Sequence, residues 1–126
     1  MSLREPLARV RGLGSAREGV SHWWMQRLSA ILLIPLSLWF VCCVAGMVTA
    51  EYADARVFLA QPLNAFLMIA LVLSSLYHGM LGIQVVIEDY VHARGLEIGL
   101  QIFVKLAAFL CALAAVYALI RITLGA

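Results

Sequence analysis

The sequence predicts an all-α membrane protein with three transmembrane helices. Its 126 residues are 64% hydrophobic and only 13% charged, and the mean hydropathy is +0.98. A water-soluble domain of this length needs far more polar residues to cover its surface. The charged residues also divide the chain into three apolar runs, each long enough to cross a hydrocarbon core of about 30 Å. We therefore expect one small membrane domain.

The first element is a basic segment, residues 1–27. It is rich in arginine: Arg4, Arg9, Arg11, Arg17 and Arg27. Several glycines make its first part a poor helix. We expect an extended cytoplasmic arm that orders against a partner, followed by a membrane domain over residues 28–126.

The first span is predicted over residues 28–50, which carry no charge. Pro35 lies inside this run, and its missing N–H should kink the helix and free a backbone carbonyl one turn earlier. Trp23 and Trp24 come before the run, where amphipathic rings favour the headgroup region. A short, slightly acidic loop is expected at 51–56.

The second span is predicted over residues 63–87, with Pro62 in the first turn of its helix, where proline is tolerated. Small and polar residues recur in this span at four-residue spacing: Ser74, His78 and Gly82. Such a row allows another helix or a flat ligand to approach the backbone closely.

A second loop, 88–97, leads to the third span, 98–120. Lys105 interrupts this span, and its long side chain can reach the interface. Arginine is concentrated ahead of the first span, so the positive-inside rule places the N-terminus in the cytoplasm. We expect a multi-pass protein of a bacterial inner membrane, with its C-terminus in the periplasm. The first span then begins, and the second ends, at the cytoplasmic face.

His78 is the most informative residue, because an imidazole in mid-membrane needs a partner. Its functional interpretation is an axial ligand to haem iron, with Gly79 and Gly82 leaving room for the porphyrin. The alternative is a histidine that hydrogen-bonds a serine on a neighbouring helix. His22 and His92 lie at span ends, so a second histidine ligand would have to come from another subunit.

Asp89 follows His78 by about three helical turns and lies on the same stripe, roughly 16 Å further along the axis. Asp89 and Tyr90 are either interface residues at a helix end or a pair that supplies protons and hydrogen bonds to a membrane ligand such as a quinone. Arg27 either marks the cytoplasmic boundary or binds a propionate or a quinone anion.

Other functions find little support. The net charge of +2 is too small to predict nucleic-acid binding. The cysteines all lie within apolar runs: Cys42, Cys43 and Cys111. They form no CxxC or Cys/His spacing, so we expect no zinc or iron–sulfur site and interpret them as small membrane hydrophobes.

Two motifs together resemble a known family. His78, Asp89 and Tyr90 form H-x10-D-Y, and a W-x3-R-x-S-A segment runs from Trp23 to Ala30. With the basic arm and the three spans, they make essentially the whole chain similar to the hydrophobic membrane anchor subunit of succinate dehydrogenase (respiratory complex II), of the D-subunit type.

The resemblance implies that the chain is part of a multi-subunit helical bundle. Two anchor subunits, the second of cytochrome b556 type, would share one haem b and form a ubiquinone site beneath a flavoprotein and an iron–sulfur subunit. His78 is implied to bind the haem iron, and Tyr90 and Asp89 to bind ubiquinone. Arg27 is implied to lie near both the haem propionates and the quinone, and His22 near the propionates.

The function implied is electron transfer from succinate to ubiquinone, a step shared by electron transport and the tricarboxylic acid cycle. The chain would not be an enzyme alone but a subunit of succinate:quinone oxidoreductase. The alternatives are a fumarate reductase anchor and a cofactor-free structural membrane adaptor, with a small transporter subunit as a more distant third.

Overall fold

The structure, a computed structural model, describes residues 16–124, with their side chains from Val20 onward. The described part contains no strand and four helices, in chain order α2 (Ala16–Gly46), α3 (Tyr52–Ala60), α4 (Pro62–Tyr90) and α5 (Arg94–Thr123). Three helices are long and apolar enough to cross a membrane, over Val20–Gly46, Pro62–Tyr90 and Arg94–Thr123. The predicted all-α membrane fold with three spans is confirmed.

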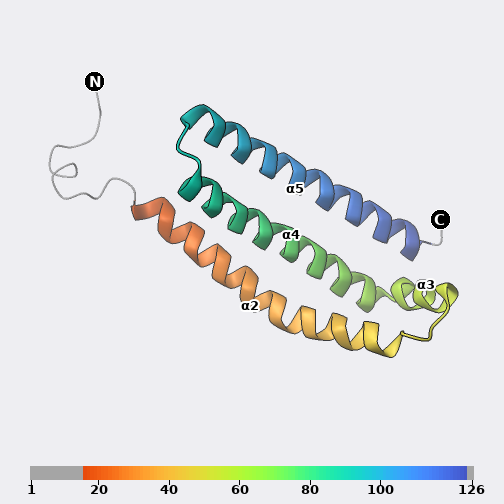
Figure 1. Cartoon of the computed structure of the whole chain (residues 1–126). Coiled ribbons are helices and arrows are strands. Elements are labelled where there is room, and N and C mark those ends of the chain that lie inside the picture. The colour runs from red at the N-terminus through yellow and green to blue at the C-terminus, as the bar shows by residue number, and fades with distance from the viewer. Residues whose placement is uncertain (1–15, 125–126) are drawn as a thin grey trace, which may run out of the picture.

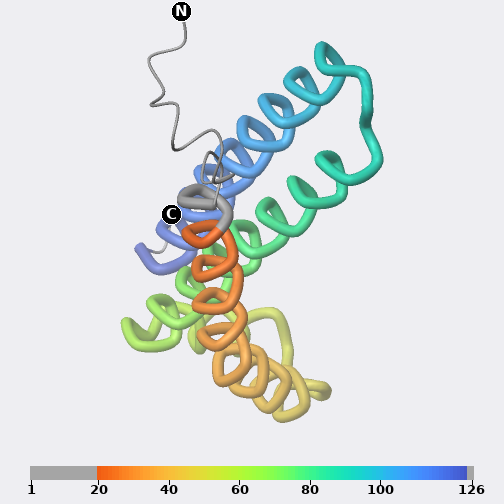
Figure 2. The backbone as a smooth tube through the Cα atoms, turned by 90° about the vertical axis from the view of Figure 1, so that its left-hand side faces the viewer, coloured from red at the N-terminus to blue at the C-terminus, as the bar shows by residue number. Residues whose placement is uncertain are grey.

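The three long helices lie in one open layer, with α4 between α2 and α5 (Figure 1). α4 packs against both neighbours, whereas α2 and α5 make no contact with each other within the described residues. A view turned by 90° shows α5 following α4, whereas α2 crosses α4 and the two helices diverge from the crossing (Figure 2). The short helix α3 contacts both α4 and α5.

α2 begins at Ala16 and therefore includes the later part of the segment predicted as an extended arm. From Val20 to Ile34 the sequence contains no glycine or proline, so nothing interrupts the helix there. Residues 1–15 of the arm lie outside the described residues. The helix continues through Pro35 and curves along its length (Figure 1).

α3 occupies the stretch predicted as a loop, 51–56, and runs beyond it. Its first turn is closed by the Glu51 backbone N–H, which donates to Asp54 Oδ2 at 3.1 Å. Phe58 of α3 stacks on Trp39 of α2, with ring centroids 6.5 Å apart and planes inclined by 22°. This aromatic pair ties the short helix to the later half of α2.

α4 begins with Pro62 in its first turn, as predicted. It ends at Tyr90, and a short connection, 91–93, leads to α5. Across this turn the Gln101 side-chain amide donates to Glu88 Oε1 at 3.2 Å. The connection between the second and third spans is therefore shorter than the predicted loop.

Few side chains are buried, because a single layer of helices has no enclosed centre. The buried hydrophobic residues of the described part are Leu36, Ala65, Leu81 and Ile87. The buried polar residues are Ser29, Asn64 and Gln84. Large apolar side chains point outward from all three long helices, which suits contact with lipid or with helices of other subunits.

Candidate functional site

His78 is half-buried and lies where α4 crosses α2. Its Nδ1 lies 3.0 Å from Ser29 Oγ, and its Nε2 lies 3.3 Å from Gln26 Nε2. The Ser29 hydroxyl also lies 3.0 Å from the backbone carbonyl oxygen of Gln26, to which it donates. Both ring nitrogens thus have partners within the chain. The contact expected for the alternative interpretation, a histidine that hydrogen-bonds a serine on a neighbouring helix, is therefore present.

A cavity of about 610 Å³ lies between α2 and α4 beside His78. Its lining residues come from these two helices alone: His22, Trp23, Gln26, Arg27, Ala30, His78, Gly82 and Val85. The structure therefore brings together three of the predicted site residues, His22, Arg27 and His78. The volume falls within the range of roughly 300–1,000 Å³ that is usual for small-molecule and cofactor sites.

Gly82 keeps part of this cavity open. A Cβ atom at this position would meet Gln26 Nε2 at 3.7 Å, an ordinary van der Waals distance. Gly79, the other glycine predicted to leave room for a porphyrin, is exposed and a Cβ there would meet nothing within 4 Å. Gly79 does not line the cavity, so the room for a flat ligand between the helices is provided by Gly82.

Two buried polar atoms in the cavity wall have no hydrogen-bond partner: His22 Nε2 and Gln26 Oε1. A buried donor or acceptor left unsatisfied costs about 1–3 kcal/mol, and native structures contain few of them. Both side chains line the cavity. A polar ligand or a partner side chain in the cavity would remove this cost.

Arg27 is exposed at the same cavity, and its Cζ lies 4.1 Å from the centroid of the Trp23 ring. Trp23 in turn meets Trp24 edge to face, with ring centroids 5.2 Å apart. No carboxylate of the described part of the chain pairs with Arg27. The cation–π contact limits the freedom of the guanidinium and leaves its donors available to an anion.

Asp89 and Tyr90 lie outside this cavity, at the C-terminal end of α4. Tyr90 is 77% exposed and follows His78 by about 18 Å of helix axis. α2 begins and α4 ends at the same end of the layer (Figure 1). The predicted residues thus lie toward one end of the molecule, but they form two groups, one in the cavity and one at the helix end.

Ser29 and Gln26 are site residues to which the sequence interpretation assigned no role. With His22 they follow a spacing of four and three residues, so the three side chains share one face of α2. That row is the available signal in the sequence. Its meaning depends on the crossing with α4, which no pattern within a single helix contains.

A bare metal ion lacks a donor set in the described residues, which include no group of three or more His, Cys, Asp or Glu side chains able to hold one. The three cysteines are free. A porphyrin brings four nitrogen donors of its own and needs one or two axial ligands from protein. His78 is therefore better suited to a haem than to an isolated ion.

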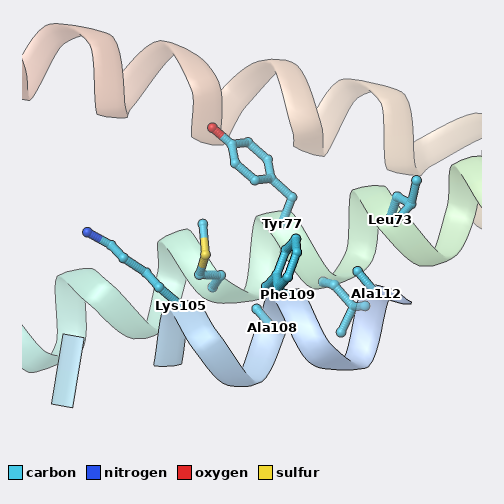
Figure 3. Close-up of a pocket in the computed structure, with 8 residues that line it drawn as sticks. Leu73, Tyr77, Lys105, Ala108, Phe109 and Ala112 are labelled. Atoms are coloured by element: carbon cyan, nitrogen blue, oxygen red, sulfur yellow. The ribbon is translucent and has the colours of Figure 1, made fainter. Parts of the chain in front are cut away.

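A second cavity, of about 330 Å³, lies between α4 and α5. Its walls are mostly apolar: Leu73, Leu76, Met80, Ala108, Phe109 and Ala112, together with Tyr77 and Lys105. Tyr77 turns its hydroxyl toward α2, and Lys105 points its ammonium group away from Phe109 (Figure 3). None of the predicted site residues lines this cavity.

The chain is similar over most of its length to membrane subunits of known enzymes. The chain matches the family model of the succinate dehydrogenase/fumarate reductase transmembrane subunit over residues 1–120. It is 36% identical over 115 residues to the succinate dehydrogenase hydrophobic membrane anchor subunit of Rickettsia bellii (strain RML369-C), a match that covers 91% of this chain and 92% of the relative. The subunit of the same description from Paracoccus denitrificans is 31% identical over 121 residues, covering 96% and 93%.

A more partial match is the succinate dehydrogenase membrane anchor subunit of Reclinomonas americana, 37% identical over 83 residues, covering 62% of this chain and 68% of the relative. No solved structure matches the chain. The resemblance found in the two motifs is confirmed by relatives that extend over nearly the whole sequence. The chain therefore belongs to the succinate dehydrogenase/fumarate reductase transmembrane subunit family.

Proposed function

We propose that this chain anchors succinate dehydrogenase in the membrane by docking its flavoprotein and iron–sulfur subunits. With a second anchor subunit of cytochrome b556 type, it contributes to a haem b site and to the site of ubiquinone reduction. Family membership and the three apolar helices support the anchoring role. The haem and quinone roles draw their support from the chemistry of the two residue groups.

The observation that carries the haem role is the cavity between α2 and α4, with His78 in its wall. An imidazole, a guanidinium and two unpaired buried polar atoms face one space. This set fits a flat, anionic ligand that contains iron, because imidazole binds iron and guanidinium pairs with carboxylates. Since two helices alone line the cavity, a second subunit would supply the remaining wall and any further ligand to the iron.

Each residue has a defined task in this proposal. His78 binds the iron, Arg27 pairs with a propionate, and His22 Nε2 gains the hydrogen-bond partner that it lacks in the chain alone. A bound haem supplies a one-electron redox centre within the membrane.

The quinone role belongs to the end of α4. The Tyr90 hydroxyl donates a hydrogen bond to a quinone carbonyl oxygen, and Asp89 passes protons from the aqueous phase. Both residues are exposed, so they are accessible to a ligand that arrives from the bilayer and to water. Arg27, on the neighbouring helix, stabilises negative charge on the reduced quinone.

The decisive experiment is an absorption spectrum of the purified complex in oxidised and dithionite-reduced states. We expect a b-type difference spectrum in the parent complex and a weakened or shifted one in His78→Ala. His92→Ala is the matched control, because His92 is an exposed histidine just beyond α4. A parent complex without a difference spectrum would overturn the haem role.

One observation favours a second candidate, the cofactor-free structural adaptor. Ser29 and Gln26 satisfy both ring nitrogens of His78 without any ligand. In an adaptor, His78→Ala lowers the thermal stability of the complex, and no haem spectrum exists in the parent. The same spectrum therefore decides between the two candidates.

The family description names both succinate dehydrogenase and fumarate reductase. We favour the first because the curated relatives at 31–37% identity carry that name. The two are distinguished by comparing the rate of ubiquinone reduction by succinate with the rate of quinol oxidation by fumarate in the purified complex. A faster fumarate-reducing direction would favour the fumarate reductase anchor.

A further inference from the structure

We infer that Ser29 is a positioning residue that holds His78 in the Nδ1–H tautomer and so leaves Nε2 as the ring nitrogen with a free lone pair. The assignment of the tautomer stands on the contacts within the chain. Its consequence for iron rests on the haem role proposed above.

The first step concerns the Ser29 hydroxyl, which has one proton to donate. It donates that proton to the Gln26 backbone carbonyl oxygen at 3.0 Å. Toward His78 Nδ1, also at 3.0 Å, the Ser29 oxygen can therefore act only as an acceptor. Nδ1 must carry the hydrogen.

The second step comes from the other side of the ring. The Gln26 Nε2 group, 3.3 Å from His78 Nε2, has donors and no lone pair to offer. His78 Nε2 must therefore be the acceptor. The two contacts, one on each ring nitrogen, therefore point to the same tautomer.

Ser29 is buried, which strengthens its hydrogen bond to His78. The residue is 8% exposed, so water has little access to compete for the serine oxygen. A hydrogen bond in such a low-dielectric setting is electrostatically stronger than one at the surface. The ring of His78 is thus fixed in orientation by a neighbour on another helix.

The consequence for a metal follows from the lone pair. A ligating histidine whose second nitrogen donates to a fixed acceptor is a stronger electron donor toward iron, because the hydrogen bond raises the basicity of the ring. Gln26 occupies the direction of the lone pair in the ligand-free chain and must turn aside when iron binds. Ser29 would remain in place, and its hydrogen bond to Nδ1 would lower the reduction potential of a bound haem.

The tautomer is tested first, in complex assembled by cells that make no haem, with 15N-histidine introduced into this chain alone. Nitrogen chemical shifts distinguish protonated from unprotonated ring nitrogens. We expect His78 in the parent, and in Ser29→Thr, to show a protonated Nδ1. Ser29→Ala should shift the population toward Nε2–H. Ser37→Ala is the control, because Ser37 is an exposed serine on the same helix.

The potential is tested in the haem-loaded complex by a redox titration followed spectroscopically. Without the hydrogen bond, ferric iron is less stabilised and the midpoint potential rises. We expect Ser29→Ala to lower the ratio of oxidised to reduced haem at a fixed poise by about threefold to tenfold, where tenfold corresponds to 59 mV for one electron. Ser29→Thr should restore the parental value.

The two arms separate the possible failures. An unchanged nitrogen pattern in Ser29→Ala overturns the tautomer assignment, and an unchanged midpoint potential overturns its consequence for iron. A parent complex that contains no haem overturns the proposed haem role, and the nitrogen pattern still decides the role of Ser29. A potential that shifts equally in Ser29→Ala and Ser37→Ala also counts against the inference.

Discussion

The two ring nitrogens of His78 have different partners on α2. Nδ1 meets Ser29, a buried hydroxyl fixed to its own helix. Nε2 meets the Gln26 side chain, whose other polar atom has no partner. Nδ1 is therefore held by Ser29. The Gln26 side chain, which contacts Nε2, can gain a hydrogen bond for its unpaired Oε1 if it rotates toward a ligand.

The clearest test at the residue scale concerns Tyr90. Tyr90→Phe removes a single hydroxyl from an exposed position, so the haem spectrum should persist while ubiquinone reduction falls. The loss of one hydrogen bond costs about 0.5–1.5 kcal/mol, which predicts a decrease of about twofold to tenfold at subsaturating quinone. Rates are measured with succinate and ubiquinone.

The matched control for this substitution is Tyr52→Phe, because Tyr52 is 78% exposed against 77% for Tyr90 and lies at the opposite end of α4. Succinate oxidation with an acceptor that takes electrons before the membrane should be spared in both variants. Parental ubiquinone reduction in Tyr90→Phe would remove Tyr90 from the quinone site.

At this scale the sequence singled out two histidines and an arginine that line the cavity, but not the residues that contact His78. His22, Arg27 and His78 were predicted as one chemical group, and they line one cavity. Ser29 and Gln26 belong to the same cluster around His78, but the row that they form with His22 on α2 does not by itself identify their partner. Their role depends on which turn of α2 faces His78, and this is a tertiary property.

Among the elements, the crossing of α2 over α4 determines where the cavity lies. The helices are in contact near Gln26, Ser29 and His78 and diverge away from that point (Figure 2). Gly82 lies one turn beyond His78 on α4, where a side chain would enter the space between the helices. The width of the cavity therefore depends on the absence of a side chain at a single position.

Gly82→Leu should fill this space and abolish haem binding. Gly82→Ala should retain it, because a Cβ meets Gln26 Nε2 at an ordinary 3.7 Å. Gly79→Leu is the matched control. Gly79→Leu and Gly82→Leu both raise helix propensity by about 1 kcal/mol, but a Cβ at Gly79 meets nothing within 4 Å. The measurement is the haem content per complex, and equal loss in Gly79→Leu and Gly82→Leu would contradict the assignment of the cavity.

Hydropathy predicted the three long helices well, because spanning a bilayer requires long apolar runs. It did not predict α3, which includes the charged stretch Glu51, Asp54 and Arg56. That helix is stabilised by the closure of its first turn and by the Trp39–Phe58 stack. α2 also extends beyond the apolar run, back to Ala16, because a helix can continue outside the apolar core.

For the whole molecule, the open layer leaves many large apolar side chains of its long helices uncovered. α2 and α5 pack on opposite sides of α4 without touching each other within the described residues, and the buried hydrophobic core of that part is small. Both ring nitrogens of His78 already have partners in the chain, whereas His22 Nε2 and Gln26 Oε1 do not. In the proposed function, the second anchor subunit would chiefly complete the cavity and cover the outer helices.

We expect little folded chain when it is expressed without the second anchor subunit, and normal accumulation when that subunit is restored. The readout is the amount of chain in the membrane and its resistance to protease. A control membrane protein expressed in the same cells should be unaffected. A chain that accumulates and resists protease equally well alone would show that the layer is self-sufficient.

The orientation in the membrane is tested by cysteine labelling in a background without Cys42, Cys43 and Cys111. The arginine-rich N-terminus predicts that the stretch around α3 faces the periplasm and that the connection 91–93 faces the cytoplasm. A cysteine at Ala53 should react with an impermeant reagent in intact cells, and one at Ala93 should react only after lysis. The reverse pattern would invert the topology.

The α2–α4 cavity is lined by residues that are synthesised before α5. Chains emerge from the ribosome N-terminal end first, and every residue that lines this cavity lies between His22 and Val85. The complete contribution of the chain to the cavity is thus made before the first residue of α5, Arg94, is added. α5, the helix that is synthesised last, contributes no residue to the lining of this cavity.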